Sequence, residues 1–178
     1  MTLRPLIILD LDETLIHSTV SRSRVPHPDF VIDGLHVKIR PHALDLLKVC
    51  FDHFDVAVWT SSAWDYAQVV VKGVFRKPYA DRLKFVWARE HCIREFDEVL
   101  KEELWAKHLS RIEQEIGYAQ DRVYLIDDSP EKFRGTPGKI IRVKPFFGDE
   151  SDIELLELAG YLARLAQSAP QEQKYGRR

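Results

Sequence analysis

Three four-residue apolar runs, each followed directly by a polar residue, constrain the fold of this chain more than any other feature of its sequence. The runs and the residues that follow them are LIIL (6–9) before Asp10, VAVW (56–59) before Thr60 and VYLI (123–126) before Asp127. Continuous apolar runs rich in β-branched residues are typical of central strands in a parallel sheet, because helices cover both faces of such a sheet. Two further runs, LKFVWA (83–88) and KIIRV (139–143), could complete the sheet.

Two of the segments between these runs have the apolar spacing of helices. Residues 40–54 place Leu44, Leu47 and Phe51 on one helical face. Residues 61–75 have the same spacing and offer Ser61 or Ser62 as the N-cap, because a hydroxyl at that position accepts a hydrogen bond from a free N–H of the first turn.

Two later segments are also expected to be helical. The pattern of residues 96–118 predicts one long helix or two short ones, ending at Gly117 as the C-cap. The pattern of residues 151–166 predicts an amphipathic helix that begins with a capping box of Ser151 and Glu154. Strand and helix therefore alternate, which predicts an α/β fold with a doubly wound, mainly parallel sheet.

Residues 19–40 interrupt this alternation. Two short β-prone stretches flank Asp33 and Gly34, a pair typical of tight hairpin turns, so a small β-hairpin insert is expected after the first strand. Residues 1–168 are expected to form a single domain, and residues 169–178 a polar, flexible tail.

The length, charge and cysteine content of the chain limit the functions that it can have. A length of 178 residues suits one core, and a formal charge of -2 argues against a protein whose main role is nucleic-acid binding. The first apolar run is too short for a signal peptide or a membrane span, so no membrane partner is expected. Cys50 and Cys92 are far apart in the sequence and predict free thiols in a reducing compartment. We expect an intracellular, cytoplasmic monomer, or a nuclear one if the source is eukaryotic.

The polar residues after the three runs predict a site at one edge of the sheet, because ligands bind beyond the carboxyl ends of parallel strands. These residues are Asp10 and Asp12, Thr60 and Ser61, and Asp127 and Asp128. Carboxylates gathered at one edge repel one another, and a divalent cation would relieve that repulsion. Oxygen ligands select a hard ion such as Mg²⁺, which proteins bind through carboxylates and a substrate phosphate. The sequence therefore predicts phosphoryl chemistry.

Several segments resemble one enzyme family. DLDETLIHS is similar to the first motif, DxDxT, of the haloacid dehalogenase superfamily, and specifically to the phosphatases that act on the C-terminal domain (CTD) of RNA polymerase II, the small CTD phosphatase or NLI-interacting factor-like family. Further similar segments are RPHALDLL, VWTSSAWDYA, AKHLSRI, YLIDDSPEKF and PFFGDESDIELLELAGYL, so the resemblance extends from residue 6 to about residue 166. It implies a haloacid dehalogenase-like (Rossmannoid) fold, and the spacing between the motifs leaves no room for a large cap domain.

The resemblance implies a Mg²⁺-dependent phosphomonoesterase that forms an aspartyl-phosphate on Asp10. It also implies that Asp12 is the general acid and then the general base. Thr60 and Ser61 would bind the phosphoryl oxygens, and Lys107 would offset the charge of Asp10 and the phosphate.

The metal site that the resemblance implies contains Asp10, the backbone carbonyl of Asp12, and Asp128 with Asp127. Thr14 is expected to hold the loop after the first strand rather than to touch substrate. The resemblance also shows departures. Relatives have Asp-Asn where this chain has Asp-Asp at 127–128.

The segment 89–106 also departs from the relatives. The assignment of the motif lysine to Lys107 therefore depends on KHLSRI, and Lys84 and Lys101 are alternatives.

A site without a large cap is open, which favours phosphoserine or phosphothreonine in a flexible protein segment as substrate. A small metabolite or a nucleic-acid 3′-phosphate is the alternative substrate, and a catalytically silent binding module of the same fold is the alternative to an enzyme. A response-regulator receiver domain also combines acids, Thr and Lys around Mg²⁺. Its acidic pair comes first in the chain, however, whereas here Lys107 precedes Asp127 and Asp128.

Overall fold

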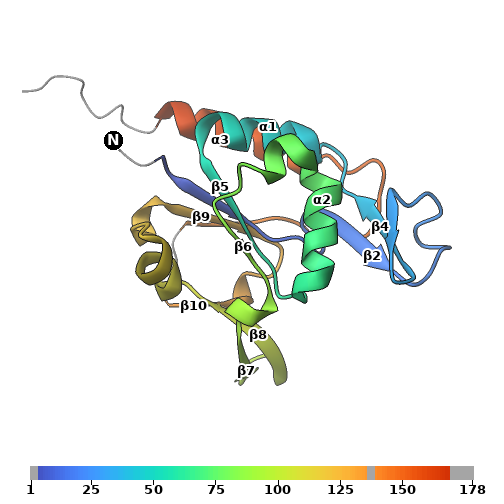
Figure 1. The fold of residues 1–178 in the computed structure, drawn as a ribbon, viewed down its shortest axis with the longest axis horizontal. Coiled ribbons are helices and arrows are strands. Elements are labelled where there is room, and N and C mark those ends of the chain that lie inside the picture. The colour runs from blue at the N-terminus through green and yellow to red at the C-terminus, as the bar shows by residue number, and fades with distance from the viewer. Residues whose placement is uncertain (1–3, 136–138, 169–178) are drawn as a thin grey trace, which may run out of the picture.

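The computed structural model describes residues 4–135 and 139–168, which form three sheets and three α-helices (Figure 1). The central sheet has the order β11-β9-β1-β5-β6, and all of its strand pairs are parallel. Its strands are β1 (Leu6–Leu9), β5 (Asp55–Trp59), β6 (Val86–Trp87), β9 (Val123–Asp127) and β11 (Lys139–Arg142). The predicted α/β fold with a mainly parallel sheet is confirmed.

The strand order brings the carboxyl ends of the three apolar runs together. Strand β1 lies between β5 and β9, and Leu9 is in register with Val58 and Ile126. The pairing continues one residue further, since the Asp10 N–H donates to the Ile126 carbonyl at 3.0 Å. The residues after β1, β5 and β9 are therefore neighbours in space although they are far apart in the sequence.

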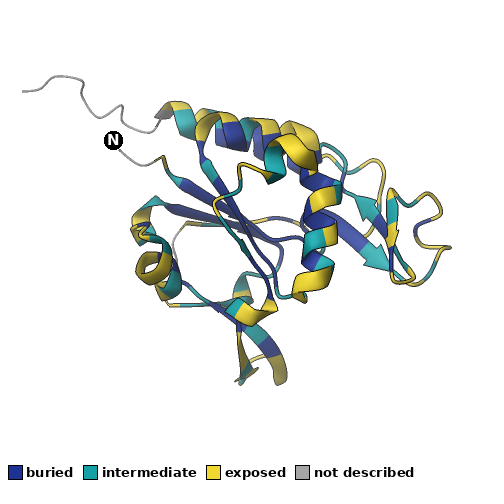
Figure 2. Ribbon diagram, viewed as in Figure 1, coloured by how far each residue is buried: buried dark blue, intermediate teal, exposed yellow. Residues whose placement is uncertain are grey.

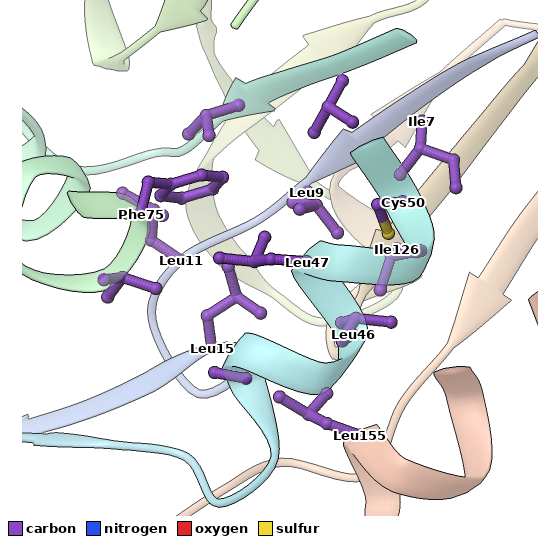
Figure 3. Packing of buried hydrophobic residues seen from close by; sticks show 14 of the residues in the cluster. Ile7, Leu9, Leu11, Leu15, Leu46, Leu47, Cys50, Phe75, Ile126 and Leu155 are labelled. Atoms are coloured by element: carbon purple, nitrogen blue, oxygen red, sulfur yellow. The ribbon is translucent and has the colours of Figure 1, made fainter. Parts of the chain in front are cut away.

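Three helices cover one face of the central sheet (Figures 1 and 2). They are α1 (Ala43–His53), α2 (Trp64–Ala80) and α3 (Glu154–Ser168). Figure 3 shows the core between α1 and the strands, where Leu46, Leu47 and Cys50 lie against Leu9 and Ile126. All five are buried. This apolar layer fixes the strands that carry the polar residues at the sheet edge.

The other face of the sheet is covered without a long helix, so the helix predicted for residues 96–118 is wrong. Its residues form two antiparallel strands, β7 (Ile93–Asp97) and β8 (Glu102–His108), followed by a π-helical turn (Ile112–Ile116) that ends at Gly117 in the left-handed conformation. Leu104 and Ala106 are buried while Glu103 is exposed, a two-residue period. Helix-forming composition suggested a helix there, but strand pairing decides the conformation.

Strand β8 also pairs in parallel with β10 (Phe133–Arg134), giving a three-stranded sheet of order β10-β8-β7 (Figure 1). The short 3₁₀ segments are Arg89–His91, Gln120–Arg122 and Pro130–Lys132. This second sheet packs beneath the central one and contributes residues to the site described below.

The hairpin insert after the first strand is confirmed. Strands β2 (Ile16–Thr19), β3 (Phe30–Ile32) and β4 (Leu35–Ile39) form a small antiparallel sheet of order β2-β4-β3. Asp33 and Gly34 both have positive φ, 46° and 83°, as a two-residue hairpin turn requires. No large cap lies among the described residues.

Three local predictions are wrong. Leu44 is 43% exposed, whereas the other two residues of the predicted face, Leu47 and Phe51, are buried together with Leu46. Neither Ser61 nor Ser62 caps α2, because Ala63 precedes the helix and makes no side-chain cap bond.

The predicted capping box of α3 is absent too. The Asp152 carboxylate, rather than the Ser151 hydroxyl, accepts the Glu154 N–H at 3.0 Å, and Ser151 bonds to Asp149. Cys50 and Cys92 are free and buried, as predicted. No helix in residues 4–135 and 139–168 has the length and apolarity needed to cross a membrane. The predicted tail, 169–178, lies outside the described residues.

Candidate active site

Lys107 lies between two buried aspartates at the centre of the site. Its Nζ donates to Asp10 Oδ1 at 2.9 Å and to Asp127 Oδ2 at 2.6 Å. Asp10 follows β1, Asp127 ends β9, and Lys107 comes from β8. All three are at most 3% exposed. The second sheet thus supplies the cation that holds two carboxylates of the central sheet.

Burial and neighbouring charges shift the pKa values of Asp10 and Lys107 in different ways. Burial raises the pKa of Asp10 to about 7, the Asp127 charge adds to the rise, and Lys107 opposes it. Burial alone would lower the pKa of Lys107, but Asp10 and Asp127 overcome that effect and raise it. Lys107 therefore stays protonated, and its positive charge favours the carboxylate form of Asp10 against the effect of burial.

Of the alternative motif lysines, neither reaches the site. Lys84 pairs with Asp55, at the opposite end of β5, and Lys101 pairs with Glu98 in the turn between β7 and β8. The geometry therefore places Lys107, rather than these two residues, beside Asp10.

Thr14 ties the loop after β1 to Asp128. Its hydroxyl donates to Asp128 Oδ1 at 3.3 Å and accepts the Asp128 N–H at 3.2 Å. The second oxygen of Asp128 accepts from the Ser129 hydroxyl at 2.9 Å. Thr14 is fully buried, so the structure gives it the loop-holding position expected from the sequence.

Asp10, Asp127 and Asp128 form a cluster whose carboxylate oxygens lie within 4.8 Å of one another. The donor set consists of oxygen atoms only, which fits a hard cation such as Mg²⁺. Two of the three carboxylates share the single charge of Lys107, so the cluster keeps a negative excess for a cation to neutralise. The residues present therefore fit the predicted metal.

Asp12 stands apart from that cluster and is held by Tyr66 of α2 and by Ser62 in the loop before this helix. Ser62 Oγ donates to Asp12 Oδ2, and Tyr66 Oη donates to Asp12 Oδ1, both at 2.6 Å. Tyr66 Oη also lies 3.0 Å from Ser18 Oγ in the hairpin insert. Burial and the Asp12 charge raise the pKa of Tyr66, so its phenol keeps the proton that it donates.

Thr60 and Ser61 occupy the loop after β5. Thr60 is buried, its N–H donates to the Trp87 carbonyl at 2.9 Å, and its Oγ1 accepts the Ser62 N–H at 3.1 Å. Ser61 Oγ is buried and has no hydrogen-bond partner among the described residues. A buried hydroxyl without a partner is costly, which points to a ligand that supplies the missing acceptor.

A cleft of about 450 Å³ opens over these residues. Its lining consists of Asp10, Asp12, Glu13, Ser18, Thr60, Ser61, Ser62, Arg89, Glu102, Glu103, Leu104, Trp105 and Lys132. The loops that follow β1 and β5 in the central sheet therefore form one wall of the cleft, and β8 forms the opposite wall. Lys107, Asp127 and Asp128 lie behind the lining.

Sequence reasoning missed several residues of this site. Ser62 was predicted only as a possible N-cap and Tyr66 was not singled out, although Ser62 lies in the loop between Thr60 and α2 and Tyr66 lies in the first turn of α2. Arg89 carries no motif signal of its own, and Lys132 lies within YLIDDSPEKF without a role that the resemblance implies. Arg89 reaches the cleft because its Nε donates to the Ser61 carbonyl at 2.9 Å.

A parallel α/β sheet with a buried aspartate after its central strand, an acidic pair at the end of the neighbouring strand and a buried lysine that bridges two of these carboxylates is the arrangement expected of a haloacid dehalogenase-like phosphatase. The chain belongs to the NLI interacting factor-like phosphatase family, whose model matches residues 5–172. Similar proteins include CTD small phosphatase-like protein 1 of Caenorhabditis elegans and CTD nuclear envelope phosphatase 1 of Xenopus laevis. Each is 32% identical to this chain, over 89% and 91% of it respectively.

The relatives are longer than this chain, which covers 31% of the Caenorhabditis elegans protein and 67% of the Xenopus laevis protein. Among solved structures, the fission yeast RNA polymerase II CTD phosphatase Fcp1 matches with a TM-score of 0.59 and 19% identity. That match covers 92% of this chain and 51% of the other. It supports the fold.

Proposed function

We propose that the chain is a Mg²⁺-dependent phosphomonoesterase that works through an aspartyl-phosphate on Asp10. The observation that carries the proposal is the position of Asp10. Its Oδ1 is held by Lys107 at 2.9 Å, and the residue lines the cleft together with Thr60 and Ser61. A held carboxylate at the floor of an open cleft is arranged for attack on a phosphorus atom.

The proposed reaction has two steps. A carboxylate oxygen of Asp10 attacks phosphorus, the bond to the leaving oxygen breaks, and that oxygen takes a proton from Asp12. Water then attacks the phosphorus of the aspartyl-phosphate and gives a proton to Asp12. The bond between phosphorus and the Asp10 oxygen breaks, so that inorganic phosphate is released and Asp10 is restored. Ser62 and Tyr66 fix the position of Asp12 for both proton transfers.

The remaining site residues would stabilise charge. Thr60 and Ser61 would donate to phosphoryl oxygens, and Lys107 would offset the charge on Asp10. Asp10, Asp128, Asp127 and the backbone carbonyl of Asp12 are proposed to hold Mg²⁺, which supplies electrostatic stabilisation of the transferring phosphoryl group when bound.

We propose phosphoserine or phosphothreonine in a flexible protein segment as the substrate. The cleft is open along β8, and similar proteins are named CTD phosphatases. An open cleft admits a polypeptide, whereas a small metabolite gains little from a site that cannot enclose it. The monomeric state and the intracellular location stay predictions.

Hydrolysis of p-nitrophenyl phosphate with Mg²⁺ tests the proposal, first on the wild type and then on Asp10→Asn. We expect turnover by the wild type and loss to background in the variant, while Asp52→Asn, an exposed acid on α1, keeps wild-type activity. Unchanged turnover in Asp10→Asn would overturn the mechanism. A panel of phosphopeptides, phosphosugars and 3′-phosphorylated oligonucleotides then identifies the substrate class.

A further inference from the structure

The cleft presents more negative than positive charge to an incoming substrate. Its lining contains the five acids Asp10, Asp12, Glu13, Glu102 and Glu103, against two cations, Arg89 and Lys132. A phosphate monoester brings up to two further negative charges. Binding of such a dianion therefore depends on the cations that are free to meet it.

Two of the three cations near the site are already engaged. Lys107 is fully buried and gives hydrogen bonds to both Asp10 and Asp127. Arg89 donates through Nε to the Ser61 carbonyl, and its guanidinium lies 5.3 Å from the centre of the Trp105 ring.

Lys132 is different. It ends the 3₁₀ segment Pro130–Lys132, directly after the acidic pair and Ser129, and it is half-buried in the cleft wall. Among residues 4–135 and 139–168, no carboxylate lies within ion-pair distance of the Lys132 Nζ. The same Nζ donates no hydrogen bond to any residue in these ranges. Lys132 lines the same cleft as Asp10, Thr60 and Ser61, so it borders the space that a bound substrate would occupy.

We propose that Lys132 is a substrate-binding residue whose ammonium group contacts the phosphoryl oxygens of the bound phosphomonoester. This inference rests on the proposed function and extends it, since it adds a lysine of the cleft lining that contacts the substrate, whereas Lys107 lies buried behind that lining. A partly desolvated ammonium group with no protein partner binds a phosphate oxygen through a charge-assisted hydrogen bond. The lysine ammonium is a point charge on a flexible side chain, which suits a residue that must release the phosphate product after each turnover.

Titration calorimetry with inorganic phosphate, in the presence of Mg²⁺, tests the contact without turnover. The proteins are the wild type, Lys132→Met, Lys132→Arg and, as a matched control, Lys48→Met, which removes an exposed lysine of α1. We expect phosphate binding to weaken about tenfold in Lys132→Met, since charge-assisted bonds contribute of that order, and to be kept within about threefold in Lys132→Arg. The control should bind like the wild type.

Steady-state kinetics with p-nitrophenyl phosphate give the second readout. We expect KM to rise about tenfold in Lys132→Met with a smaller change in kcat, because the contact is present in the ground state as well as the transition state. If the Met variant melts well below the wild type, Lys132→Gln replaces it in both measurements.

Phosphate binding by Lys132→Met or Lys132→Gln within about twofold of the wild type would overturn the inference. If the wild type binds phosphate through Lys132 but hydrolyses no phosphomonoester of the panel, the proposed function fails and the binding site stands. If the wild type is active and the variants match it, the inference alone fails.

Discussion

Lys107 Nζ lies 2.9 Å from Asp10 Oδ1 although 97 residues separate the two along the chain. The contact joins the second sheet to the central one, because Lys107 belongs to β8 and Asp10 follows β1. The same ammonium group also bonds to Asp127 at the end of β9. The position of the second sheet against the central one therefore determines whether Lys107 reaches the candidate site.

Replacing Lys107 with methionine should harm both activity and stability. The change leaves Asp10 and Asp127 buried without their shared cation, and removal of one partner from a buried ion pair costs about 3 to 5 kcal/mol. We expect a loss of that order in the free energy of unfolding, measured by urea denaturation without metal, and a fall of about 100-fold or more in kcat. Lys84→Met, whose lysine pairs with Asp55 and is 44% exposed, should change either quantity little. A Lys107→Met protein as stable as the wild type would contradict the role given to the trio.

Mg²⁺ should stabilise the folded protein through the acidic cluster. A ligand at about 100 times its dissociation constant adds about 2.7 kcal/mol to the free energy of unfolding, so the melting temperature should rise with Mg²⁺ concentration. Asp128→Asn removes one charge of the cluster and should reduce that rise, while Asp52→Asn should keep it. An equal Mg²⁺ response in the Asp128→Asn protein would argue against the cluster as the metal site.

The sequence predicted the central sheet and the residues at its edge because each strand is a local pattern, and the parallel order alone brings the strand ends together. It failed at residues 96–118, where helix-forming residues adopt a β7–β8 hairpin whose second strand also pairs with the distant strand β10. It also missed Arg89 and Lys132, whose places depend on how loops approach each other across the cleft. Contacts between segments far apart in the sequence leave no local pattern.

Tyr66 should act on turnover through Asp12. Tyr66→Phe removes the donor to Asp12 Oδ1 at 2.6 Å and keeps the ring. A less firmly held Asp12 transfers protons less effectively, so we expect kcat for p-nitrophenyl phosphate to fall about tenfold or more with a smaller change in KM. Tyr161→Phe, at an exposed position of α3, is the matched control. A rise in KM with kcat unchanged would instead make Tyr66 a substrate-binding residue.

Arg40 connects the loop after β1 to the start of α3. Its guanidinium is buried, binds both oxygens of Asp152 at 2.9 and 2.8 Å, and donates to the Thr14 carbonyl at 3.1 Å. Burial alone would raise the pKa of Asp152, but the Arg40 hydrogen bonds and charge hold it below its ordinary value. The pair therefore supports Thr14, which in turn holds Asp128.

The stability that this pair contributes should depend on pH. Because the pKa of Asp152 is lower in the folded state than the unfolded value of about 3.9, the contribution is fully present above that value and is lost as the pH falls through the folded-state pKa. Asp152→Asn should therefore lower the free energy of unfolding by about 2 kcal/mol at pH 7, and the difference from the wild type should shrink below about pH 4. Urea denaturation of both proteins over a pH series measures this difference, with Asp52→Asn, at an exposed position of α1, as the matched control. A difference that stays constant down to acid denaturation would mean that the Asp152 charge is not what stabilises the loop.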